Sequence, residues 1–167
     1  MKKRSRPILN LAKAPFHKWK HGSAYEADIS WLGQAMGSKK LGFNVAVVPP
    51  GKRVFPYHQH SAQEELFFVL EGRGSIRLGG RKRRIRQGDF ISIPPGPGSA
   101  HQIINDSDAP LRYLAVSTME IPEVAFYPDL GKIGIYTGTP PGKAPAKGSL
   151  RHYTYLDRGV TYWDGES

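Results

Sequence analysis

Three histidines and one glutamate in the middle of the chain have the residue types and the spacing to bind a metal ion. His58 and His60 are separated by one residue, so in a β-strand both imidazoles lie on the same face. Glu65 begins the apolar run of the next predicted strand, and His101 opens another strand after a loop rich in Pro and Gly. Imidazole and carboxylate ligands suit Fe(II), Mn(II), Zn(II), Ni(II) or Cu(II) and leave coordination positions open for a substrate.

Composition excludes several other kinds of site. The chain has 167 residues and no cysteine, which rules out disulfide scaffolds, Cys-ligated zinc, iron-sulfur clusters and thiol nucleophiles. No apolar run approaches the roughly 20 residues that cross a bilayer, and no signal-peptide apolar region follows the basic start. We therefore expect a cytoplasmic protein with no membrane partner.

The net charge of +10 is concentrated in two segments. These are Lys2, Lys3, Arg4 and Arg6 at the start, and Arg81, Lys82, Arg83, Arg84 and Arg86 further on. Without these nine residues, 15 Lys and Arg face 14 Asp and Glu, so the rest of the chain is almost neutral. We interpret Arg81 to Arg86 as a solvated hairpin that deters edge-to-edge aggregation, and we do not expect a nucleic-acid partner. The second interpretation is that the positive charge of this hairpin attracts anionic ligands.

The elements that must position the four candidate ligands are short strands. Stretches rich in β-branched and aromatic residues recur between Gly and Pro from Glu26 onward, which predicts an all-β protein. The predicted strands cover 26–31, 42–48, 54–60, 65–70, 74–78, 81–86, 89–93, 101–104 and 111–117. Gly79-Gly80 predicts a two-residue type I′ hairpin turn. Such a pattern is typical of a sandwich or a barrel.

One domain accounts for the chain length. We expect a basic N-terminal extension over 1–25, a barrel core over 26–120 and a C-terminal extension over 121–167 that packs on the barrel. The aromatic residues near the end, among them Tyr153, Tyr162 and Trp163, are the reason to expect packing there rather than disorder.

Two stretches of this chain resemble the two motifs of the cupin superfamily. PPGKRVFPYHQHSAQEELFFVLEG, from Pro49 to Gly72, has the His-x-His pair, the downstream Glu and the closing Gly of the first motif. GDFISIPPGPGSAHQIIN, from Gly88 to Asn105, is similar to the second motif. Two loops are longer here than in the motifs, before His58 and before His101, where insertions cost little.

The resemblance implies a single-domain, double-stranded β-helix, the cupin jelly-roll barrel, with one divalent metal ion on His58, His60, Glu65 and His101. The wider chain is similar to bacterial cupins of unassigned function, some labelled sugar-phosphate isomerases by analogy. A barrel of this size holds one small ligand. Candidate pocket residues are Asn44, Tyr57, Gln59, Phe67, Gln102 and Ile103.

These residues predict a metal-dependent enzyme acting on a small polar or anionic molecule. Isomerase and dioxygenase chemistry both remain open, and no catalytic base is identified. The alternative is a non-catalytic sensor or storage protein for a metal or small molecule. The resemblance also implies a homodimer, with the strand near Ala27 to Trp31 adding to the partner's sheet.

Overall fold

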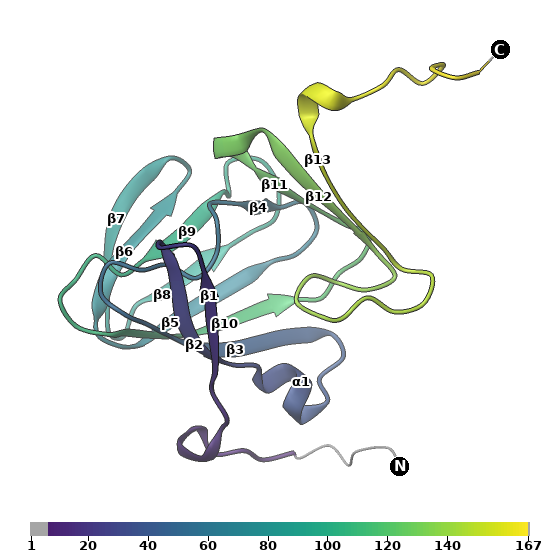
Figure 1. Cartoon of the computed structure of the whole chain (residues 1–167). Helices are drawn as coiled ribbons and strands as arrows, with labels where there is room; N and C mark the ends of the chain where they lie inside the picture. Colours follow the sequence, from purple (N-terminus) through teal and green to yellow (C-terminus); the bar gives the residue numbers. More distant parts are fainter. Residues whose placement is uncertain (1–6, 167) are drawn as a thin grey trace.

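The computed structural model describes residues 7–166, which form antiparallel β-sheets with little helix (Figure 1). Its strands are β1 (His17–His21), β2 (Tyr25–Ser30), β3 (Leu41–Val48), β4 (Gln59–His60), β5 (Glu65–Glu71), β6 (Arg73–Leu78), β7 (Arg81–Arg86), β8 (Phe90–Ile93), β9 (His101–Ile104), β10 (Leu111–Thr118), β11 (Glu123–Tyr127), β12 (Lys132–Thr137) and β13 (Leu150–Tyr155). One short helix, α1 (Leu32–Met36), and the 3-10 turns η1 (Leu11–Lys13), η2 (Pro128–Leu130) and η3 (Leu156–Arg158) complete it. The all-β prediction is confirmed.

The strands form three sheets in the described part of the chain. Their orders are β1-β2-β3-β10-β5-β8, β13-β12-β11-β4 and β7-β6-β9. Isolated bridges join Arg53 to Ile104 and His58 to His101, so the segment between β3 and β4 runs along β9. The predicted hairpin is confirmed, because Leu78 pairs with Arg81 and both Gly79 and Gly80 have the positive φ that a type I′ turn requires.

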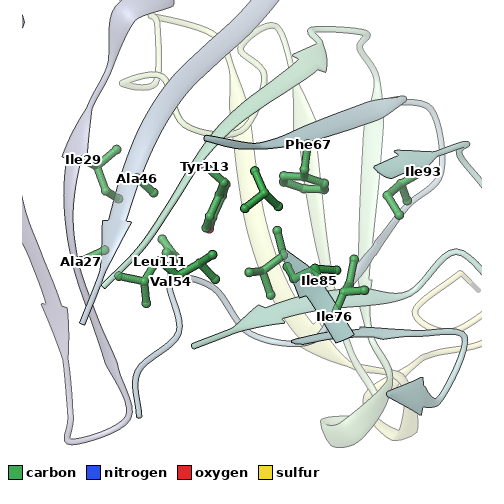
Figure 2. Packing of buried hydrophobic residues seen from close by; sticks show 13 residues of the cluster. Ala27, Ile29, Ala46, Val54, Phe67, Ile76, Ile85, Ile93, Leu111 and Tyr113 are labelled. Atoms are coloured by element: carbon green, nitrogen blue, oxygen red, sulfur yellow. The ribbon is translucent and has the colours of Figure 1, made fainter. Parts of the chain in front are cut away.

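The inward positions of the strands build one apolar core (Figure 2). Phe67 on β5 and Tyr113 on β10 are both nearly fully buried, and their rings meet edge to face with centroids 5.9 Å apart. Ile29 on β2 and Leu111 on β10 are completely buried. Phe67 of this core also contacts the His101 ring, with centroids 5.5 Å apart.

Two differences from the predicted strands concern the N-terminal half. Residues 54–60 do not form one strand, because only Gln59–His60 pairs as β4 while His58 makes a single bridge to β9. The sequence also gave no sign of β1, which pairs along β2. Since β2 lies between β1 and β3 of the same chain, the prediction that the strand near Ala27 to Trp31 adds to a partner's sheet is wrong.

The C-terminal segment supplies the second sheet (Figure 1). β11 pairs with β4 next to His60, and β12 and β13 continue outward from it. Tyr153 lies on β13 of this sheet and packs against Tyr136. Tyr162 and Trp163 are 86% and 72% exposed. The expectation that the last aromatic residues pack on the barrel is therefore wrong for these two. The basic start, Met1 to Arg6, lies outside the described residues. No helix in the range 7–166 has the length and apolar character needed to cross a membrane.

Candidate metal centre

Backbone pairing brings the candidate ligands together from four places in the fold. His58 and His101 exchange two backbone hydrogen bonds, with N···O distances of 3.1 and 2.7 Å. His60 pairs with Ala125 of β11, and Glu65 is the first residue of β5. Residues far apart in the sequence thus meet at one end of the core.

The donor atoms of these side chains lie close to one another. One ligand atom each from His58, His60 and Glu65 falls within 4.8 Å of the others. Glu65 Oε2 is 3.6 Å from His60 Nε2 and 2.8 Å from His101 Nε2. The structure thus groups His58, His60 and Glu65, and His101 meets this group through Glu65; the four-residue ligand set stays a prediction.

Each imidazole presents the same nitrogen to the centre, because the other nitrogen is engaged elsewhere. His58 Nδ1 is 2.8 Å from the Pro56 carbonyl oxygen, and His101 Nδ1 is 3.1 Å from the Ser99 carbonyl oxygen. His60 Nδ1 is 3.1 Å from Glu123 Oε1. All three partners are acceptors, so in the neutral imidazoles Nδ1 carries the proton and Nε2 keeps its lone pair. This is the tautomer that metal-binding histidines need.

Two buried atoms at the centre lack a hydrogen-bond partner among the described residues: Glu65 Oε2 and His101 Nε2. They are 2.8 Å apart, so one cation could contact both. An unsatisfied buried polar atom is costly. A bound cation would satisfy both, so the residues present fit a divalent metal.

The protonation states of His58 and Glu65 suit metal binding. Burial lowers the pKa of His58 to about 4, and the neighbouring His101 and His60 act in the same direction. Burial alone would raise the pKa of Glu65, but His101 and the other two imidazoles outweigh it and lower this pKa to about 2. At neutral pH the centre therefore offers a neutral His58 and an ionised Glu65, the forms that bind cations.

Glu123 on β11 holds His60 in place and was not predicted from the sequence. It is completely buried, and besides His60 it accepts backbone N–H donations from Ser61, Ala62 and Gln63 at 3.0, 2.9 and 3.1 Å. Burial alone would raise the pKa of Glu123, but His60 and these N–H groups lower it below its usual value. No motif marked this residue, since its partner lies 63 positions earlier in the chain.

A cavity of about 540 Å³ opens from the centre. Its inner end is lined by His58, His60 and Glu65, and its C-terminal side by Tyr127, Tyr136, Tyr153, Lys143 and Arg151. A smaller space of about 50 Å³ lies deeper, beside His101 and Phe67. The larger cavity falls within the usual size range for small-ligand sites.

Four of the six predicted pocket residues line one of the two cavities. Asn44 lines both cavities, while Phe67, Gln102 and Ile103 line the smaller one. Gln102 donates its amide N–H to the Phe55 carbonyl oxygen, which keeps that group engaged.

Two of the predicted pocket residues line neither cavity, and for them the prediction is wrong. Tyr57 is buried on another side, where its hydroxyl accepts the Gly80 N–H and Arg77 stacks on its ring. Gln59 lies between His58 and His60, so strand alternation turns it away from the centre.

Comparison with known proteins identifies the fold. Residues 44–117 match the family described as Cupin domain, and all the candidate ligands lie inside this range. Residues 44–117 therefore resemble a cupin domain, and the structure has the cupin fold. A structure from Acidithiobacillus ferrooxidans is 23% identical with a TM-score of 0.77, covering 92% of this chain and 95% of that one. A structure from Silicibacter pomeroyi, described as a sugar phosphate isomerase of the cupin superfamily, is 25% identical with a TM-score of 0.74, covering 95% of this chain and 98% of that one.

A curated relative matches the central region only. It is an uncharacterized protein of Methanocaldococcus jannaschii, 39% identical over 72 residues. The match covers 43% of this chain, and the chain spans 55% of the relative's length.

Proposed function

We propose that this cupin is a metal-dependent enzyme in which His58, His60, Glu65 and His101 bind one divalent ion, Fe, Mn, Zn or Ni. The observation that carries the proposal is the cluster of His58, His60 and Glu65 donor atoms, beside which the buried Glu65 Oε2 and His101 Nε2 lie 2.8 Å apart without a hydrogen-bond partner among the described residues. A bound ion would act as a Lewis acid on substrate oxygens and leave positions open for them. The substrate is a small molecule with oxygen donors that fits the 540 Å³ cavity.

The chain's own residues would orient the substrate and supply hydrogen-bond donors. Burial raises the pKa values of Tyr127 and Tyr136 above their ordinary range, so these phenols stay protonated at neutral pH. They would donate hydrogen bonds to substrate oxygens rather than act as bases. Isomerisation is our first choice of reaction, by analogy with the Silicibacter pomeroyi protein, and oxygen-dependent cleavage is the second.

A non-catalytic binding protein is the rival function, and one feature favours it. Among the described residues that line the larger cavity, Glu65 is the sole carboxylate. A site that uses its one carboxylate as a ligand has no second carboxylate for proton transfer. Metal binding without turnover would fit this arrangement.

Elemental analysis of the purified chain tests the metal proposal. We expect one equivalent of a divalent metal in the wild type and a large loss in His58→Ala. His152→Ala is the matched control, because His152 is exposed on β13 and lies outside the cavity. Sugar-phosphate isomerisation and oxygen-uptake screens of the loaded protein then separate the enzyme from the rival. Metal retention in His58→Ala at the wild-type level would contradict the assignment.

Two further proposals concern the molecule as a whole. We retain a homodimer and a cytoplasmic location from the family resemblance and the composition. Light scattering tests the homodimer, and a monomeric mass would count against it. Cell fractionation tests the cytoplasmic location, and a membrane-bound fraction would count against that.

A further inference from the structure

The C-terminal sheet presents three tyrosines to the larger cavity, one from each of β11, β12 and β13. We call Tyr127, Tyr136 and Tyr153 the phenol cluster. The Tyr153 ring lies 6.4 Å from that of Tyr127 and 5.9 Å from that of Tyr136, and the Tyr136 and Tyr153 hydroxyls are 2.5 Å apart. The cluster also adjoins the metal centre, because Tyr127 stacks on His58 at 6.1 Å.

A glycine makes room for the phenol cluster. A Cβ atom at Gly134 would lie 2.8 Å from the Tyr153 ring, closer than real contacts allow, and 3.2 Å from the Tyr136 ring, which is a tight contact. Gly134 sits opposite Tyr153 in the β12–β13 pairing. The rings are therefore packed over a residue with no side chain, which fixes their positions along the cavity wall.

Cations surround the phenol cluster without carboxylate partners. Arg151 lies over the Tyr136 ring at 5.7 Å, and Lys132 lies over the Tyr127 ring at 4.5 Å. Lys143 lines the cavity beside Arg151, whose guanidinium donates to the Lys143 carbonyl oxygen. In residues 7–166, no carboxylate oxygen lies within 4.0 Å of any of these three cations. Other cations of the chain, such as Arg77 with Asp129, do have such partners.

The charge of the cavity wall selects the ligand. Lys143 and Arg151 are its cations, and Glu65, at the opposite end, is its carboxylate. A bound divalent ion would make the cavity still more positive, so it suits an anion. Protonated phenols, an ammonium group and a guanidinium group offer more donors than the two oxygens of a carboxylate can accept. The three terminal oxygens of a phosphate monoester match them better.

We infer that Arg151, Lys143 and the phenol cluster form a subsite for the phosphoryl group of the substrate, whose other end reaches the metal centre. This inference rests on the proposed function and narrows the substrate class to small phosphorylated molecules with oxygen donors at the opposite end. The residues of the subsite lie on β11, β12 and β13 and in the loop between β12 and β13, all outside the matched residues 44–117.

Calorimetric titration of inorganic phosphate into the full, metal-loaded chain tests the subsite. We expect Arg151→Gln to raise the Kd for phosphate at least tenfold, Lys143→Gln to raise it severalfold, and Tyr153→Phe to raise it by a smaller factor. Metal content, measured in parallel, should be unchanged in all three. Arg158→Gln is the matched control, because Arg158 stacks on Tyr155 and does not line the cavity.

Two further arms separate this inference from the proposed function. His58→Ala should lose metal yet bind phosphate within about threefold of the wild type, since Arg151 and Lys143 remain. Acetate should bind more weakly than phosphate to the wild type. The inference is overturned if phosphate binding disappears with the metal, if acetate binds as tightly as phosphate, or if Arg151→Gln and Lys143→Gln bind phosphate normally. If the chain binds phosphate as expected but no metal, the proposed function fails and the phosphate subsite is still supported.

Discussion

Replacing Glu123 by glutamine should weaken both the fold and the metal site. One carboxylate oxygen of Glu123 serves His60 and the Ser61 N–H, and the other serves the N–H groups of Ala62 and Gln63. The glutamine NH₂ group replaces one of these oxygens, so two donors lose their acceptor whichever way the amide turns. At about 1 to 3 kcal/mol for each unsatisfied buried donor, the free energy of unfolding should fall by roughly 2 to 6 kcal/mol.

The same substitution releases the ring of His60. Loss of a group that orients a metal-binding histidine typically weakens metal affinity by about 10- to 100-fold, which is roughly 1.4 to 2.7 kcal/mol. Urea unfolding of the metal-free chain and competition with a coloured chelator measure the two effects. Glu64→Gln is the matched control, because Glu64 is exposed and adjacent to the ligand Glu65. Metal affinity equal to the wild type in a folded Glu123→Gln protein would refute the reasoning.

Three further predictions concern stability. In the metal-free chain, the pKa of His58 is about 4 when folded and 6.5 when unfolded. The contribution of His58 to the free energy of unfolding is therefore fully present above pH 6.5. It is lost toward pH 4, because the unfolded chain binds the proton more readily. The loss is roughly 3 kcal/mol, and His58→Asn should show a correspondingly shallower pH dependence in urea unfolding. Gly88→Ala should cost about 1 to 3 kcal/mol from its positive φ alone, and equal stability to the wild type would be inconsistent with that strain. Gly72→Ala should cost more, because its Cβ would also overlap the Pro110 carbonyl oxygen; similar losses in the two variants would argue against that overlap.

The candidate ligands could be picked out from the sequence because their signal is local. One intervening residue places His58 and His60 on the same side of the chain, and Glu65 and His101 stand where strands begin. The resemblance to the cupin motifs then joined segments that strand periodicity alone could not pair. The hairpin at Gly79 and Gly80 was predictable for the same local reason.

The outer parts of the site were not predictable, because they depend on pairing between distant strands. Glu123 reaches His60 only because β11 pairs with β4. The phenol cluster needs the register of β11, β12 and β13, of which the sequence showed no more than scattered tyrosines. Tyr57 was misassigned because its contacts with Gly80 and Arg77 have no local signal in the sequence. Gln59 was misassigned although it lies between His58 and His60, where strand alternation turns it away from them.

Anomalous X-ray scattering from crystals of the metal-loaded chain tests the central claim most directly. We predict a single strong peak bonded to Nε2 of His58, His60 and His101 and to a carboxylate oxygen of Glu65, at about 2.0 to 2.2 Å for Zn. A peak elsewhere in the molecule, or a metal bound through Nδ1 of these histidines, would contradict the account.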